Sequence, residues 1–279
     1  MNLKFLHKAQ SLLPPKEKTN LLFSYLKEKY NNSPDPWGLD LDLCRKVFEM
    51  SWPLYRHYFN VKVHGVENVE DHPYMVVSNH TGQIPIDGLV IACAFMWEIY
   101  PPRILRGMVE RFVPKIPFIG TLIAQGGSIL GDRQNCNYLL ERGESTLVFP
   151  EGVRGISKST KDYYKLQSFT RGFFRQALVS QIDILPIAVV GAEDTFPYVY
   201  HPKKLMKLFG LPAFPLTPFP LPLPSPIDIY IGKPYKVPKD LSSDAPEKEI
   251  NKHVFKIENE IKEMIANGLK NKRTIMKRD

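Results

Sequence analysis

The stretch YMVVSNHTGQIPIDG (Tyr74–Gly88) joins a short apolar run to a histidine and an aspartate. Its first part, Tyr74–Val77, is continuously apolar, which is typical of a strand covered on both faces. The run breaks at Ser78, and His80 follows at once, with Asp87 seven residues further on. This spacing fits no metal-ligand pattern, so the stretch predicts a buried strand that delivers an ionisable pair at its end.

Segments with strand and helix patterns alternate through most of the chain. Further strands are predicted at 61–66, 104–109, 128–130, 146–149, 184–190 and 227–231, and helices at 40–58, 86–98, 136–142 and 171–180. Such alternation predicts an α/β fold with a central, mostly parallel sheet flanked by helices. Additional helices are expected near the N-terminus and the C-terminus.

The two ends of the chain differ from this alternating part. Residues 1–30 mix apolar and basic side chains, which fits either a membrane-surface helix or an ordinary amphipathic helix packed on the body. The last helix is expected to begin near Asp244, because Asp244 and Glu247 have capping-box spacing. The chain therefore divides into an N-terminal helical region over 1–58, which could contact a membrane, an α/β domain over 59–240, and a C-terminal helix with a basic tail over 241–279.

A proline-rich run, LPAFPLTPFPLPLPSP, occupies residues 211–226. Proline at this density excludes a helix and a central strand. A polar linker would not carry so many Leu and Phe side chains. We therefore expect the run to bury them against the protein body, an acyl chain or a membrane.

The charge balance points to an anionic partner. The 37 Lys and Arg residues exceed the 29 Asp and Glu residues, which gives a net charge of +8 and suggests nucleic acid, anionic lipid or a phosphorylated substrate. The positive charge is concentrated at Lys4–Lys29 and Lys270–Arg278, which favours an anionic membrane surface over a nucleic-acid groove. The three widely spaced cysteines indicate buried thiols in a reducing compartment.

No segment looks able to cross a bilayer. The longest apolar stretch, Leu89–Trp97, is far short of the ~20 residues of a spanning helix. No signal peptide is visible, because Lys8 and Gln10 interrupt the apolar start of the chain. We expect a peripheral protein on the cytoplasmic side of a membrane, without a transmembrane helix.

Four polar stretches lie at the ends of predicted strands. They are SNHTGQIPID (78–87), GSILGDR (127–133), VFPEGVRG (148–155) and ILPIAVVGAED (184–194). Ligands of parallel α/β sheets bind outside the carboxyl ends of the strands. These distant stretches are therefore expected to converge on one site.

The chemistry of that site depends first on the histidine. A histidine with a pKa near ~6.5 can accept a proton at neutral pH, and a carboxylate on its other ring nitrogen would fix the tautomer and stabilise the imidazolium. No serine or cysteine is set up as a nucleophile, so His80 would act directly on a substrate hydroxyl. Taken alone, the pair of His80 and Asp87 also fits a structural hydrogen bond in a turn.

The other polar loops carry anion-binding groups. The planar guanidinium of Arg154 suits a phosphate, and Gly152 lets the backbone approach a ligand closely. Arg133, at the end of another predicted strand, could add a second positive group or form a surface salt bridge.

Together these stretches resemble the glycerolipid and lysophospholipid acyltransferase family, which includes 1-acylglycerol-3-phosphate acyltransferases. GSILGDR is similar to the family's second block, through Gly127 and Arg133. FPEGVRG is similar to its third, Phe-Pro-Glu-Gly-Thr-Arg-Ser, with Val153 and Gly155 in place of Thr and Ser. ILPIAVV is similar to the fourth, at Pro186. The resemblance covers residues 60–235.

The first block departs from the usual pattern. The family's aspartate stands five residues after the histidine, where this chain has Pro85. The sequence NHTGQIPID instead resembles the Asn-His-Ser-Gly-x-x-Pro-x-Asp form of a branch similar to monoacylglycerol and diacylglycerol acyltransferases. The GAED sequence and the proline-rich run also look like that branch, which need not use a phosphorylated acceptor.

The resemblance implies transfer of a fatty acyl group from acyl-CoA or acyl carrier protein to a lipid hydroxyl. It makes His80 the general base and Asp87 its orienting partner. The substrate-binding residues that it implies are Asn79, Gly82, Arg133, Glu151, Gly152 and Arg154. Backbone N–H groups near Gly152 or in the 79–82 turn are the expected oxyanion donors. No cofactor, metal or covalent enzyme intermediate is expected.

Several alternatives remain open on the sequence. An ester hydrolase could use the same base on water, but the Gly-x-Ser-x-Gly elbow of such enzymes is absent. A catalytically silent family member could bind lipid without turning it over. The acceptor could also be a neutral alcohol, as in wax or acylglycerol synthesis.

Overall fold

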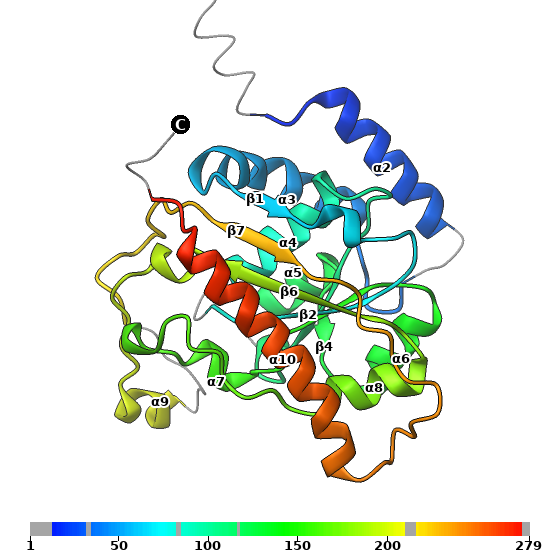
Figure 1. Cartoon of the computed structure of the whole chain (residues 1–279). Coiled ribbons are helices and arrows are strands. Elements are labelled where there is room, and N and C mark those ends of the chain that lie inside the picture. Colours follow the sequence, from blue (N-terminus) through cyan, green and yellow to red (C-terminus); the bar gives the residue numbers. More distant parts are fainter. Residues whose placement is uncertain (1–12, 32–34, 82–84, 116–117, 210–215, 275–279) are drawn as a thin grey trace, which may run out of the picture.

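The structure, a computed structural model, describes residues 13–31, 35–81, 85–115, 118–209 and 216–274 (Figure 1). Within these residues the strands form one seven-stranded sheet in the order β1-β7-β6-β2-β5-β3-β4. The strands are β1 Lys62–His64, β2 Met75–Ser78, β3 Arg106–Val109, β4 Ile129–Leu130, β5 Thr146–Val148, β6 Ile184–Val190 and β7 Asp228–Ile231. All neighbouring pairs are parallel except the antiparallel pair β6–β7, which confirms the predicted α/β class.

Helices cover both faces of this sheet. They are α2 Lys16–Asn31, α3 Leu41–Pro53, α4 Ile86–Trp97, α5 Ile119–Gln125, α6 Arg133–Glu141, α7 Val153–Ile156, α8 Gly172–Ser180, α9 Lys203–Phe209 and α10 Glu247–Lys270. A π-helical turn, Leu54–Tyr58, continues α3. Single 3-10 turns cover Val66–Asn68, Val113–Lys115, Thr160–Asp162 and Glu193–Thr195.

The central strand β2 explains why its sequence is apolar at every position. Tyr74 and Val76 pack into a core with α2, α3 and α4, whereas Met75 and Val77 pack into a second core with α6, α8 and α10. Side chains alternate between the faces of a strand. Because both faces of β2 are covered, each residue of the run is buried, as the sequence predicts.

The added helices at both ends of the described chain pack on the body. Leu22, Phe23 and Leu26 of α2 are buried in the first core, so this helix fits the ordinary amphipathic alternative. The predicted apolar stripe of α10 is also buried, and Figure 1 shows this helix lying across one face of the sheet.

The predicted capping box of α10 is wrong. The helix begins at Glu247, after Pro246, and no side chain caps it. A proline disfavours the helical conformation of the residue before it, so the helix cannot extend back toward Asp244. The backbone N–H of Asp244 instead donates to the Ser242 hydroxyl, at 3.1 Å.

The described part of the proline-rich run, residues 216–226, forms no helix, and its one strand-like contact is a bridge between Leu216 and Tyr200. The Leu223 N–H donates to the Thr195 carbonyl at 2.7 Å. Leu216 and Leu221 stay 45% and 73% exposed, so the protein body does not cover them. The first part of the run, 210–215, lies outside the described residues.

Two further expectations concern thiols and membrane crossing. Burial raises the pKa of Cys44 and of Cys93 to about 12 and that of Cys136 to about 11. All three thiols are free and buried, as predicted.

Among the helices of the described chain, none has both the length and the apolar character needed to span a bilayer.

Candidate active site

His80 and Asp87 meet at the carboxyl end of the central strand. β2 ends at Ser78, and Asp87 lies in the first turn of α4. His80 Nδ1 and Asp87 Oδ2 are 2.6 Å apart. The Asp87 carboxylate also accepts hydrogen bonds from the Thr81 and Gly88 N–H groups, both at 2.8 Å. The longer loop therefore brings together the pair that the sequence predicts.

The electrostatics of Asp87 determine the tautomer of His80. Burial raises the pKa of Asp87, but the charge of His80 and the hydrogen bonds from His80, Thr81 and Gly88 lower it, and the resulting pKa lies below the ordinary range. An ionised carboxylate can only accept hydrogen bonds, so Nδ1 of His80 carries the proton. Nε2 is then the basic nitrogen. In the described part of the chain no hydrogen bond to Nε2 is found, and the side chain is 13% exposed.

The face of the His80 ring and the His80 backbone contact the FPEG loop and Lys158. Its ring stacks on Phe149, with the ring centres 4.3 Å apart and the planes inclined by 19°. Its backbone N–H donates to Glu151 Oε1 at 2.7 Å, and its carbonyl accepts from Lys158 Nζ at 2.8 Å. The ring and the backbone of His80 therefore have separate supports.

Glu151 is buried, and both of its carboxylate oxygens have partners within the protein. Besides the His80 N–H at Oε1, its Oε2 accepts from the Gln167 N–H at 2.8 Å and lies 3.0 Å from Lys158 Nζ. Glu151 thus joins the loops after β2 and β5. Its expected contact with a substrate stays a prediction.

Asn79 and Gly152 also have structural contacts. The Asn79 amide pairs with the Val189 backbone in both directions, at 3.1 and 2.8 Å, and so ties β2 to β6. Gly152 adopts a φ of +57°, where a side chain would be strained. Its N–H donates to the Phe149 carbonyl at 2.9 Å. The predicted residue Gly82 lies outside the described residues.

Three of the expected oxyanion donors are already paired within the protein. The N–H groups of His80, Thr81 and Gly152 already donate to Glu151, Asp87 and Phe149 respectively. A donor that is already paired does not stabilise an oxyanion without breaking its own bond. An oxyanion site formed by other N–H groups near Gly152 or in the 79–82 turn stays a prediction.

The two predicted arginines lie on different helices, Arg154 on α7 and Arg133 on α6. Arg154 is exposed and donates to the Ser168 carbonyl at 2.7 Å. Arg133 is exposed at the start of α6, after the edge strand β4. Three strand spacings separate β4 from β2, which is roughly 14 Å. Within the described chain Arg133 forms no ion pair, so its salt-bridge alternative gains no support, and its phosphate-binding role stays a prediction.

Sequence reasoning missed two residues of this site, Lys158 and Glu193. Both side chains are almost fully buried, and Lys158 Nζ lies 3.5 Å from Glu193 Oε1. Glu193 belongs to the GAED sequence after β6, which was visible as part of the fourth stretch. Lys158 stands in an ordinary polar segment, ISKST, that carries no motif.

Glu193 predicts a measurable pH dependence of stability. Burial raises its pKa from an ordinary 4.5 to about 7, against the opposing charge of Lys158. Between these values the folded state binds more protons than the unfolded chain, so this group's contribution to stability falls as the pH rises from 4.5 to about 7. The difference over the whole window is on the order of 3 kcal/mol.

Urea unfolding of the wild type and of Glu193→Gln, at about pH 5 and about pH 7.5, measures this contribution. The wild type should lose more unfolding free energy between the two pH values than the variant does. Equal losses in both proteins would show that Glu193 titrates normally.

Residues 60–190 match the family model described as Acyltransferase. Among curated proteins, an uncharacterized protein of Mycobacterium bovis is 36% identical over 77% of this chain and 62% of its own length. A DGAT1/2-independent enzyme synthesizing storage lipids from Bos taurus is 25% identical over 81% of this chain and 67% of its own. A 1-acyl-sn-glycerol-3-phosphate acyltransferase of Saccharomyces cerevisiae is 27% identical over 47% of this chain and 43% of its own.

These matches agree with the site geometry. The matched region contains the histidine, its aspartate and the FPEG loop that holds the histidine backbone. The chain spans less than two thirds of the length of the mycobacterial relative. No group of three or more metal-ligating side chains is found among the residues that the structure describes. Residues 60–190 of this chain are therefore similar to the acyltransferase family.

Proposed function

We propose that the protein transfers a fatty acyl group from a thioester, acyl-CoA or acyl carrier protein, to a hydroxyl of a glycerolipid or related lipid. The observation that carries this proposal is the contact of 2.6 Å between His80 Nδ1 and the buried carboxylate of Asp87. It leaves Nε2 as a base at the carboxyl ends of the parallel strands, where α/β proteins bind their ligands.

In the proposed reaction Nε2 of His80 removes the proton of the acceptor hydroxyl as its oxygen attacks the thioester carbonyl. Asp87 stabilises the imidazolium that results. The tetrahedral intermediate then expels the thiolate, which takes the proton back from Nε2. The products are one new ester and one free thiol, and no bond forms to the protein.

Two relatives bear on the proposed class of acceptor. The storage-lipid enzyme of Bos taurus is similar over most of this chain, which supports a neutral glycerolipid acceptor. The yeast relative is named for a phosphorylated acceptor, and such a lipid would need Arg154 or the more distant Arg133. We propose a glycerolipid hydroxyl, with the neutral and the phosphorylated acceptor as separate outcomes of one experiment.

Purified protein is incubated with acyl-CoA or acyl carrier protein thioester and with lysophosphatidate, monoacylglycerol, diacylglycerol or a fatty alcohol. We expect thiol release and an acylated product with at least one of these acceptors. Equal thiol release without an acceptor would indicate a thioesterase. No turnover with either donor would indicate a family member that binds lipid without acylating it.

The packing of His80 predicts the effect of one small substitution. A Cβ added at Gly155 would lie 2.7 Å from the His80 Cβ and 3.0 Å from the Glu151 Cβ, closer than packed atoms tolerate. Gly155→Ala must displace the base, and displacements of this kind lower kcat roughly 10- to 100-fold. Gly172→Ala is the control, since its Cβ would meet no atom within 4 Å. Similar kcat values for the two variants would show that close packing against Gly155 does not fix the position of His80.

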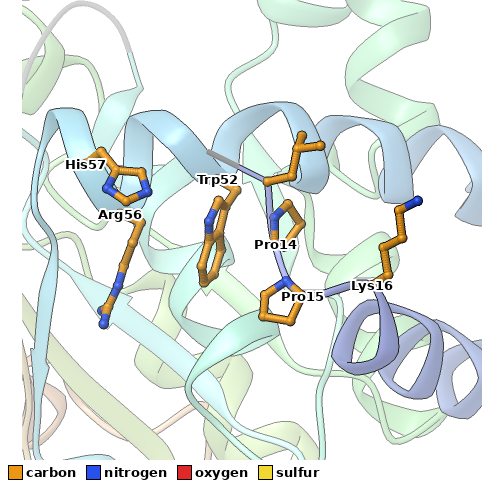
Figure 2. A pocket seen from close by; sticks show the side chains of 7 residues that line it. Pro14, Pro15, Lys16, Trp52, Arg56 and His57 are labelled. Atoms are coloured by element: carbon orange, nitrogen blue, oxygen red, sulfur yellow. The ribbon is translucent and has the colours of Figure 1, made fainter. Parts of the chain in front are cut away.

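We also propose that the protein docks on an anionic membrane through one face near α3. A pocket of about 460 Å³ lies there, lined by Leu13, Pro14, Pro15, Lys16, Trp52, Arg56 and His57 (Figure 2). In Figure 2, Trp52 lies between the two prolines and the pair of Arg56 and His57. Basic groups beside an apolar floor fit an anionic lipid surface.

Exposed apolar side chains extend this docking face. Leu13, Leu54 and Leu221 are 58%, 41% and 73% exposed. The Tyr58 hydroxyl donates to the Pro222 carbonyl at 2.7 Å, which places the proline-rich run beside the π-helical turn. The face therefore combines apolar groups that could enter the lipid with cations that could contact its head groups.

Arg56→Glu tests the docking face by co-sedimentation with vesicles that contain anionic lipid. Reversing one charge near such a surface should cost about 1–2 kcal/mol, which is roughly a 5- to 30-fold loss of binding. Lys256→Glu makes the same charge change at an exposed position of α10, which packs on the other face of the sheet. Equal vesicle binding by the two variants would exclude this face as the docking surface.

A further inference from the structure

We propose that Lys158 is a positioning residue of the reaction, because it fixes the backbone of His80 through a closed ring of contacts. The inference rests on the proposed function and adds a residue to it. Lys158 is 3% exposed, so it acts through His80 and not by touching a substrate.

The ring consists of three residues from three segments. The His80 N–H donates to Glu151 Oε1 at 2.7 Å, Glu151 Oε2 lies 3.0 Å from Lys158 Nζ, and Nζ donates to the His80 carbonyl at 2.8 Å. Both polar groups of the His80 backbone are therefore bound to one ion pair. This arrangement holds the Cα of the proposed base against the loop after β5.

A lysine suits this place because of its donors. An ammonium has three N–H donors, and Nζ faces three oxygens, which are the His80 carbonyl, Glu151 Oε2 and Glu193 Oε1. The contact with Glu193 is the longest of the three, at 3.5 Å. Lys158 therefore links the loops after β2, β5 and β6, which carry the first, third and fourth stretches of the sequence pattern.

The effect of Lys158 on folding stability differs from its proposed effect on the catalytic rate. The desolvation of a buried ion pair offsets most of its Coulomb attraction, so the intact pair adds little net stability, whereas removing one partner leaves a buried charge and destabilises the protein. Position is different, because a shift of about 1 Å in a reacting group can cost 100-fold in rate. Because stability and position can both change in a Lys158 variant, kcat is compared only among variants that urea unfolding shows to be folded under the assay conditions.

The test compares Lys158→Met, Lys158→Arg and the control Lys161→Met, a change at an exposed lysine three residues away. We expect the Met variant to lose roughly 10- to 100-fold in kcat with KM within about twofold. The Arg variant, which keeps the charge and several donors, should fall between it and the wild type. Lys161→Met should match the wild type.

A second readout needs no turnover. The NMR resonance of the proton that His80 Nδ1 shares with Asp87 reports the position of the ring, and it should shift in both Lys158 variants. If the Met variant does not fold, the Arg variant decides, because its broader head group cannot reproduce all the Nζ contacts. The proposal is overturned if a folded Lys158→Met variant keeps the wild-type kcat and resonance. If Lys158→Met does not fold, the same result with Lys158→Arg overturns it. Absence of turnover in the wild type would contradict the proposed function alone.

Discussion

Replacing His80 by glutamine is expected to lower kcat for acyl transfer by about 10²- to 10⁴-fold, the usual contribution of a general base. Glutamine has a similar reach and keeps an N–H that can donate to Asp87. It has no nitrogen that accepts a proton at neutral pH, so only the proton transfer is lost. Steady-state kinetics with a thioester donor and the active acceptor measures the effect, and urea unfolding checks that the variant is folded.

The protein contains its own control for this substitution. His64 and Asp228 form a second His–Asp pair, with Nε2 and Oδ1 2.8 Å apart. The His64 ring also stacks on an aromatic ring, that of Tyr230, at 4.7 Å. This pair joins β1 to β7, away from the FPEG loop, so His64→Gln should leave kcat unchanged. Equal losses in the two variants, or more than a tenth of wild-type kcat in His80→Gln, would exclude His80 as the base.

Replacing Asp87 by asparagine is expected to lower kcat by about 10²- to 10⁴-fold as well, through the tautomer of His80. The amide can turn its oxygen to the Thr81 N–H or to His80 Nδ1, but it cannot carry the charge that stabilises an imidazolium. If its NH₂ group faces Nδ1, the proton moves to Nε2, and the basic nitrogen is lost. KM for the donor should change little, because Asp87 is fully buried and does not reach a substrate.

The same variant should also be less stable at neutral pH. The low pKa of Asp87 means that folding favours its charged form, so this stability is present above about pH 4 and is lost as the pH falls through the folded-state pKa. The unfolding free energy of the wild type should therefore approach that of Asp87→Asn on acidification. Asp42→Asn, an exposed carboxylate in the first turn of α3, is the control and should keep full kcat. Constant separation of the wild type and Asp87→Asn at all pH values would contradict this account.

The sequence predicts the central sheet and the His–Asp pair because both depend on local pattern. The continuous apolar run at Tyr74–Val77 requires cover on both faces, and the polar residues after it must lie at the sheet's edge. The resemblance to the branch with the longer loop also anticipates that Asp87 reaches His80.

Other features depend on contacts that no spacing shows. Lys158 contacts His80 across 78 residues of chain, and its own segment carries no signal. The separation between β2, which precedes His80, and β4, which precedes Arg133, follows from the strand order, because β5 and β3 lie between them. The capping prediction at Asp244 failed because the constraint that Pro246 puts on the preceding residue outweighs the spacing of two acidic side chains.

The most direct test of the central claim is the stoichiometry of one reaction. A thioester with a labelled acyl chain is incubated with the wild-type protein and an active acceptor, and free thiol and labelled ester are measured together. The account predicts one ester for each thiol, no thiol without acceptor, and both products formed at least about 100-fold more slowly with His80→Gln. Thiol formed without ester, or ester formed at the wild-type rate by His80→Gln, would contradict it.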